Sequence, residues 1–282
     1  MRRSQSWRVG TVVTARDEEH TIGKCLASLK DQTVKNFLVV VNDGSLDGTR
    51  AVASRFADVI VDLPTHRQNL GGTPELARVF NAGFDALKRE GVDYVLVSGA
   101  DAVYPPNYVE EIVRRMQKRK LVLSSGIAEG ESSRSLSPRG SGRVFDSEWF
   151  LNIGFKYPLK YGFEVYPVYK ALSKGREIAV FVDVKFRLLR RTRLSRRRLH
   201  LWGRGMKALN YWCLYAVGRA AVIGVRNPLN GSALLAGYLS HVPQQYDDIK
   251  HFVPRFQKRI FIKRLREVLT GKSSYTSQIF VD

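Results

Sequence analysis

The sequence predicts an α/β fold in which a mostly parallel sheet is covered by helices on both faces. Short, almost uniformly apolar runs alternate with stretches of helical periodicity, and polar side chains directly follow several of these runs. Uniformly apolar strands are typical of a parallel sheet buried on both sides, since half-exposed strands alternate apolar with polar residues. Ligands of such sheets bind at the carboxyl ends of the strands.

The elements of this fold follow in order from the first β-branched run, over 9–14. A polar turn comes next, and then a helix in which apolar residues recur at Ile22, Leu26 and Leu29. Prolines near the start of two later helices suit the first helical turn. Further strands are expected over 37–41, 58–63, 93–99 and 121–126, and further helices over 49–56, 74–90 and 105–120.

The pattern changes after residue 126. Residues 127–142 are rich in Ser, Gly and Arg and have no apolar periodicity, which predicts a mobile loop. We divide the chain into an α/β domain over 1–185 and a basic, aromatic, mainly helical region over 186–282. The expected later elements are an aromatic, helical stretch from Val144, a strand over 177–184, a basic run over 185–200, and helices over 207–225, 229–239 and 256–269.

The net charge of +20 is concentrated near the end of the chain. Residues 183–282 hold 20 basic and 5 acidic side chains, a net charge of +15. Such a region attracts polyanions, either an anionic membrane surface or nucleic acid. A solvated basic surface without a partner is the simpler alternative.

An apolar stretch over 208–225 contains Asn210 and Arg219, and a central arginine is costly within a bilayer. We interpret the tail as helices on a membrane surface, with basic residues toward headgroups and Tyr, Trp and Leu toward acyl chains. A single span and a packed helical subdomain without lipid contact are the alternatives.

Isolated Cys25 and Cys213 indicate a reducing compartment, and the first residues lack a signal-peptide core. We therefore expect a cytoplasmic protein, peripheral on the inner face of the cell membrane.

Polar clusters follow the strands that end near residues 14, 41 and 99. A carboxylate such as Asp43 can accept a hydrogen bond from a base or a ribose hydroxyl. Taken singly each cluster is weak, because Asp and Gly fill turns for local reasons. On successive strands, they indicate one ligand site. The first two clusters comprise Thr14, Ala15, Arg16 and Glu18, and then Asn42 and Asp43.

The most specific motifs are TARDEEHTIGKCLASLKDQT, VVVNDGSLDGT and SGADAVYPPNYV. Through them, over about residues 8–185, the chain resembles the inverting glycosyltransferases of family 2, which have the Rossmann-like GT-A fold. The resemblance implies a UDP or GDP sugar as donor and a base recognised by Asp43. It also implies that THRQNLGG brings Arg67 and Gly72 to the nucleotide. The remaining nucleotide-side residues are then Thr14, Ala15, Arg16, Glu18, Asn42 and Ala100.

The family usually carries a DxD triplet that holds a divalent cation on the donor's phosphates. Here the triplet is Gly99, Ala100, Asp101, so the first acid is missing. The resemblance implies Mg²⁺ or Mn²⁺ at Asp101, since phosphate oxygens and waters can complete the shell. The cation would stabilise charge on the leaving diphosphate. Alternatively Asp101 only caps the following helix. His200 is either a late phosphate or metal contact or a structural residue.

An inverting transfer needs a base that takes the proton of the acceptor hydroxyl. Glu164 stands in YGFEVYPVYKAL, where the family carries Gly, an aromatic residue, Glu and Asp; Val165 replaces the second acid. We expect Glu164 to be the base, with Asp146 as second candidate. If the acceptor is an ionised phosphate, no base is needed, and Glu164 would orient the donor or the metal.

The segment RGSGRVF resembles the acceptor loop of dolichyl-phosphate sugar synthases within the same family. The resemblance implies that Arg139 and Arg143 bind an acceptor phosphate, whereas a solvated loop is the alternative. We expect transfer with inversion to a polyprenyl phosphate, a lipid-linked glycan or a glycolipid. The alternatives are a soluble or protein acceptor, with the tail used for oligomerisation, or an inactive sugar-nucleotide-binding module. A basic nucleic-acid-binding protein would leave the strand-end clusters unexplained, so no nucleic-acid partner is expected.

Overall fold

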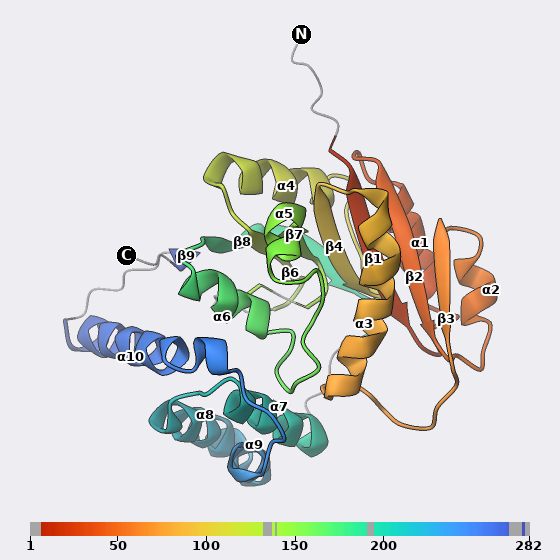
Figure 1. The fold of residues 1–282 in the computed structure, drawn as a ribbon. Coiled ribbons are helices and arrows are strands. Elements are labelled where there is room, and N and C mark those ends of the chain that lie inside the picture. The colour runs from red at the N-terminus through yellow and green to blue at the C-terminus, as the bar shows by residue number, and fades with distance from the viewer. Residues whose placement is uncertain (1–6, 132–136, 139, 191–194, 271–277, 280–282) are drawn as a thin grey trace.

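The structure is a computed structural model that describes residues 7–131, 137–138, 140–190, 195–270 and 278–279, with side chains described as far as Lys263 (Figure 1). The predicted loop over 127–142 therefore lies partly outside the described residues. Its first two residues extend a strand, and its last three are ordered at the edge of the site.

The strands form one sheet in the order β3-β2-β1-β4-β7-β6-β8-β5. The half that contains β3, β2, β1 and β4 is parallel, and so is the β6–β8 pair, as the sequence predicts. β7 lies antiparallel between β4 and β6. The bounds are β1 Val9–Ala15, β2 Asn36–Asp43, β3 Val59–Leu63, β4 Tyr94–Gly99, β5 Ala102–Val103, β6 Leu123–Ala128, β7 Arg143–Asp146, β8 Ile178–Leu188 and β9 Gln278–Ile279, which pairs with β8.

Helices cover both faces of the sheet, because each buried strand alternates its apolar side chains between two cores. Val13, Leu38 and Val40 pack with α1 and α4, whereas Val12 and Val39 pack with α3, α5 and α6 on the other face. The bounds are α1 Ile22–Lys30, α2 Thr49–Ala53, α3 Pro74–Leu87, α4 Tyr108–Arg119, α5 Ser147–Asn152 and α6 Tyr166–Ser173, with a short 3₁₀ turn η1 at Lys88–Glu90.

Two expectations for the later elements are corrected by the structure. The aromatic stretch from Val144 begins as β7, because Val144 and Phe145 pair with β4 before α5 starts. The single helix expected over 207–225 is two helices, because Asn210 adopts a left-handed φ of 58°, which ends the first one. The tail contains α7 Arg196–Ala208, α8 Cys213–Arg226, α9 Pro228–Leu239, the 3₁₀ turn η2 Asp247–Ile249 and α10 Phe252–Thr270.

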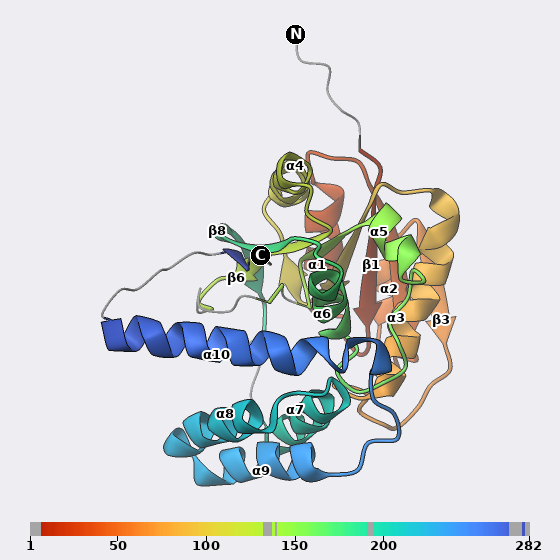
Figure 2. The same ribbon diagram turned by 60° about the vertical axis from the view of Figure 1, so that its left-hand side comes forward.

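The helices α7, α8 and α9 form a bundle on the side of the molecule toward which β1 and β2 run (Figures 1 and 2). The long α10 lies between this bundle and the sheet domain, where Phe256 contacts Tyr169 of α6 (Figure 2). Of the helices in the described ranges, none is both long enough and apolar enough to cross a membrane.

Glycines let the bundle helices approach backbone to backbone. A Cβ at Gly237 of α9 would lie 1.9 Å from the carbonyl oxygen of His200 in α7, and a Cβ at Gly203 would lie 2.1 Å from that of Leu234. A Cβ at Gly231 would likewise lie 2.6 Å from the carbonyl oxygen of Ala220 in α8. Because these neighbours are main-chain atoms, no side-chain rotation relieves the clash.

Gly237→Ala is therefore expected to lower the free energy of unfolding by about 1–3 kcal/mol through overpacking. Gly218→Ala is the matched control, because a Cβ there meets nothing within 4 Å. The free energy of unfolding of Gly218→Ala should rise by a few tenths to about 1 kcal/mol, since alanine is the better helix former. Thermal and urea unfolding measure both; equal effects of the two variants would contradict the close packing.

Candidate functional site

Register brings the ends of three parallel strands to one level. Thr14 of β1 lies opposite Val41 of β2 and Gly99 of β4, and Ala15 lies opposite Asn42. Neighbouring strands are about 4.8 Å apart, so the ends of β2 and β4, on either side of β1, are separated by about 10 Å. The predicted clusters therefore meet at one carboxyl edge, close enough for one ligand of nucleotide size.

Asp43 ends β2 in a hydrogen-bonded group with His66 and Arg16. Its Oδ1 lies 3.1 Å from Nε2 of His66, and the Arg16 guanidinium approaches Nδ1 of that ring at 2.7 Å. Arg16 also donates to the carbonyl oxygens of His66 and Gln68. Gly44 makes this possible: it has a φ of 62°, and a Cβ there would lie 2.5 Å from Cα of Thr65. The turn after β2 can thus pack against the segment that carries His66.

Arg190, beyond the end of β8, joins the carboxylates of the other two strand ends. Its guanidinium donates to Oε1 of Glu18, and its Nε lies 3.7 Å from Oδ2 of Asp101. The Glu18 and Asp101 side chains are 11% and 23% exposed, so both open onto the same partly solvated space. Asp43 and Asp101 are therefore linked through the β1 turn, which carries both Arg16 and Glu18.

Glu164 reaches this edge across the segment 140–142. Its Oε1 lies 2.9 Å from the position that a Cβ of Gly140 would take. The next residue, Ser141, accepts a hydrogen bond from the backbone N–H of Gly99 at 3.1 Å. A Cβ at Gly99 would lie 3.2 Å from both Ser141 Oγ and Asp101 Oδ1. Segment 140–142 thus lies against both Glu164 and the end of β4, and its Ser141, with Asp101, crowds the position that a first acid at residue 99 would take.

Arg143, predicted as an acceptor contact, is a buried structural residue in this arrangement. It is 2% exposed and donates to the carbonyl oxygens of Pro138, at 2.7 Å, and Glu164, at 2.5 Å. A buried cation needs such partners, because burial removes its hydration. The prediction that Arg143 binds an acceptor phosphate is therefore corrected, because its guanidinium is buried and hydrogen-bonded to these carbonyl oxygens. Its predicted companion, Arg139, lies outside the described residues.

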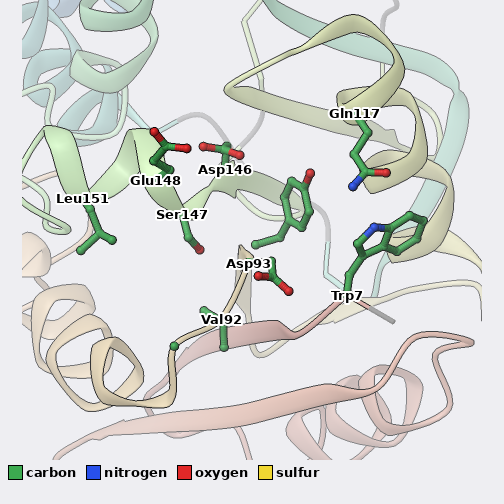
Figure 3. A pocket seen from close by; sticks show the side chains of 10 residues that line it. Trp7, Val92, Asp93, Gln117, Asp146, Ser147, Glu148 and Leu151 are labelled. Carbon is green, nitrogen blue, oxygen red and sulfur yellow. The ribbon is translucent and has the colours of Figure 1, made fainter. Parts of the chain in front are cut away.

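Asp146, the second candidate base, lies at the opposite end of the strands, beside the amino end of β4. The expectation that it is near the site is therefore corrected too. It pairs with Tyr94, the first residue of β4, so it is about 17 Å along the strand from the carboxyl end. There its Oδ1 caps α5 by accepting from the N–H of Trp149. Burial, with repulsion from Glu148, raises the Asp146 pKa. Asp146 lines a shallow groove with Trp7, Asp93 and Gln117 (Figure 3).

The remaining predicted residues differ in how far they face the site. Asn42 is buried: its Oδ1 accepts from the N–H of Ser45 in the turn, and its amide donates to Asp62 of β3 at 2.8 Å. That second hydrogen bond, with one from Arg50, lowers the Asp62 pKa. His200 lies in α7, where its main chain packs against Gly237. Of the others, Ala15 and Ala100 are buried, Thr14 is half-buried, Arg67 is exposed beside His66, and Gly72 has a φ of 81° and faces Leu201 of α7.

The residues at this edge do not form a ready site for a divalent cation. Over the described ranges, no group of three or more His, Cys, Asp or Glu side chains could hold a metal ion. Asp101 is the single acid of its triplet, and Arg190 already approaches it. A guanidinium beside this carboxylate repels a further cation.

Sequence reasoning missed His66 and Arg190. His66 stands in the THRQNLGG segment, where the neighbouring Arg67 was chosen, and only the packing at Gly44 shows which of the two faces Asp43. Arg190 is one of many arginines in a basic run, and its place depends on the pairing of β5 with β8. No local signal separates it from its neighbours.

Solved structures define the class of fold. The mannosyltransferase PcManGT from Pyrobaculum calidifontis, in complex with GDP-Man and Mn²⁺, matches with a TM-score of 0.58 and 17% identity over 96% of this chain and 77% of that chain. S. aureus TarS 1–349 in complex with UDP-GlcNAc matches with a TM-score of 0.53 and 17% identity over 71% of this chain and 65% of that chain. This fold is the GT-A fold of glycosyltransferases.

The family follows from sequence. Glycosyl transferase family 2 matches residues 11–200, well over half of the chain, and the chain belongs to this family. The Bacillus subtilis (strain 168) protein named "Putative glycosyltransferase EpsH" is 29% identical over 143 residues, which are 50% of this chain and 37% of that relative. The chain thus spans little more than a third of that relative.

Arg143→Met is expected to lower the unfolding temperature without any ligand, because the carbonyls of Pro138 and Glu164 lose their donor; a lost hydrogen bond to a charged group costs about 1.5–3 kcal/mol. The control is Arg89→Met, at an exposed position of η1, which should change stability by less than about 0.5 kcal/mol. Differential scanning fluorimetry distinguishes them. If Arg143→Met left stability unchanged, the buried structural role would be refuted.

Proposed function

We propose that this protein transfers a sugar, with inversion, from a nucleotide-diphosphate sugar to a membrane-associated acceptor. The observation that carries the proposal is the meeting of Asp43, Asp101 and Glu164 at one carboxyl edge, within reach of one extended ligand. Membership of glycosyl transferase family 2 supports the reaction class. UDP-GlcNAc and GDP-Man in the structures of similar fold support the donor class, UDP or GDP.

The binding of the donor's nucleobase is assigned to the group of Asp43, His66 and Arg16. Asp43 is 7% exposed, so its carboxylate is partly desolvated, and a hydrogen bond from a base N–H is stronger there than in water. The ribose and diphosphate would then run along the β1 turn toward Glu18 and Asp101. Arg67, exposed beside His66, and Thr14 remain proposed contacts along this path.

Glu164 is assigned as the base that takes the proton of an acceptor hydroxyl. The hydroxyl oxygen attacks C1 of the sugar while the C1–oxygen bond to the diphosphate breaks, and that electron pair leaves with the diphosphate. The attack comes from the face opposite the leaving group, which gives inversion. Glu164 and Asp101 both lie close to segment 140–142, Glu164 at Gly140 and Asp101 near Ser141, which supports a base and a leaving group that serve the same sugar.

The Mn²⁺ in the PcManGT structure supports a divalent cation in the reaction of that protein. At Asp101 of this chain the single carboxylate, approached by Arg190, does not fit a preformed cation site.

The acceptor class is inferred from the tail. Of the eleven exposed large apolar side chains in the described part of the chain, eight lie between 214 and 262. On α8, Leu214, Val217, Val222 and Val225 are 61%, 47%, 72% and 88% exposed. An exposed apolar helix face beside a strongly basic composition is typical of helices on an anionic membrane surface. Because the bundle lies toward the carboxyl edge, this surface would bring a lipid acceptor to the site (Figure 1).

Glu164→Gln is expected to reduce the rate of sugar transfer by about 10²–10⁴-fold, the usual contribution of a general base, while donor affinity changes little. Asp146→Asn is the control, since it keeps the helix cap and lies at the far edge of the sheet. Transfer to a lipid extract and calorimetric donor binding measure the two quantities. Equal losses of transfer and affinity in Glu164→Gln would count against the base.

Membrane binding is expected to depend on the apolar face of α8. Leu214→Ser combined with Val225→Ser should reduce co-sedimentation with anionic vesicles by about tenfold or more, since two exposed apolar side chains contribute about 1.5–3 kcal/mol each when buried. Leu151→Ser combined with Leu159→Ser is the control, because both leucines are exposed outside the tail.

Light scattering on the same proteins addresses the alternative of a soluble or protein acceptor, in which the tail serves oligomerisation. If the wild type is a dimer that does not bind vesicles, and the Leu214/Val225 variant is a monomer, the membrane proposal is overturned and that alternative is favoured.

A further inference from the structure

Arg190 occupies the place where the resemblance expects a metal ion. It lies between Glu18, to which it donates a hydrogen bond, and Asp101, whose Oδ2 is 3.7 Å from its Nε. Its side chain is 58% exposed, so it remains accessible from solvent. A guanidinium has five N–H donors, and the described hydrogen bonds use one of them.

Backbone pairing, and not a side-chain rotamer alone, delivers Arg190 to this point. β5 follows Asp101 directly and runs antiparallel to the end of β8, with Ala102 opposite Leu188. The N–H of Leu189 then donates to the carbonyl oxygen of Asp101 at 2.8 Å. Arg190 follows Leu189 in the chain, so this backbone hydrogen bond holds it beside Asp101 whether or not a nucleotide is bound.

Within the described residues this site lacks a group of three acids or other ligands that could hold a metal ion, and it already contains a guanidinium. Gly99 stands where a first acid would be, and a Cβ there would lie 3.2 Å from Ser141 Oγ and from Asp101 Oδ1, a crowded position for a further side chain. Without the nucleotide, Glu18 and Asp101 place two formal negative charges beside the single positive charge of Arg190. When a diphosphate enters, its oxygens offer a planar guanidinium the bidentate geometry that a guanidinium binds best.

We propose that Arg190 is the resident cation for the donor's diphosphate in this protein, and that donor binding does not require a divalent metal ion. The inference rests on the proposed function. Glu18 and Asp101 act as positioning residues that hold the guanidinium. As the C1–oxygen bond breaks, Arg190 donates hydrogen bonds to the diphosphate oxygen that receives the electron pair.

The test is isothermal titration of UDP and GDP into the full chain, once with EDTA and once with Mn²⁺. For the wild type, at least one nucleotide is expected to bind in EDTA, with a Kd that Mn²⁺ changes by less than about threefold. Arg190→Gln should weaken binding in EDTA by about tenfold or more, and Mn²⁺ should recover part of that loss, because Asp101 is then open to the ion.

Two variants complete the experiment. Arg190→Lys keeps the charge without the planar fork and is expected to lie between the wild type and Arg190→Gln. Arg187→Gln, at an exposed position of β8 three residues before Arg190, controls for the loss of one positive charge and should bind like the wild type.

The outcomes separate this inference from the proposed function. Nucleotide binding by the wild type only with Mn²⁺, or equal affinities of wild type and Arg190→Gln in EDTA, would overturn the role of Arg190 and leave the glycosyltransferase proposal intact. A loss in Arg190→Gln that Mn²⁺ does not recover, together with a lower unfolding temperature, would make Arg190 merely structural. No binding of either nucleotide under either condition would defeat both proposals.

Discussion

The parallel register of β1 with β2 and β4 is the constraint on which the rest of the site depends. Because Thr14 is paired with both Val41 and Gly99, the chain leaves the sheet at the same level three times, and each exit carries polar residues. Burial of the strands' apolar side chains in both cores stabilises this arrangement. Slipping β2 by one residue would exchange its two faces and point Asp43 elsewhere.

Electrostatics then determines how the carboxylates of this edge are held. The chain carries a net charge of +20, yet the acids at the strand ends are the groups that orient the neighbouring basic side chains. Asp43 holds His66, and Glu18 with Asp101 holds Arg190. Such pairs in partly desolvated positions retain more interaction energy than pairs on the open surface. The basic tail contributes through Arg197 of α7, which donates to the carbonyl of Asn69 at 2.6 Å and so closes the bundle onto the loop after β3.

Much of this arrangement could be predicted from the sequence, because local patterns determine the apolar strands and the turns that follow them. The clusters at Thr14, Asp43 and Asp101 were located in this way, and the family comparison confirms the class. Asp146 and Arg143 were misjudged because neither burial nor the antiparallel return of β7 can be read from residue types. His66 and Arg190 were missed because each depends on a contact between segments distant in sequence, one at Gly44 and the other at the β5–β8 pair.

A crystal structure of the full chain with UDP or GDP tests the central claim most directly. The account predicts the base beside Asp43 and His66 and the diphosphate beside Asp101 and Arg190, in one continuous site at the carboxyl edge. A nucleotide bound elsewhere, for example in the groove lined by Trp7 and Asp93 at the opposite edge, would contradict it (Figure 3).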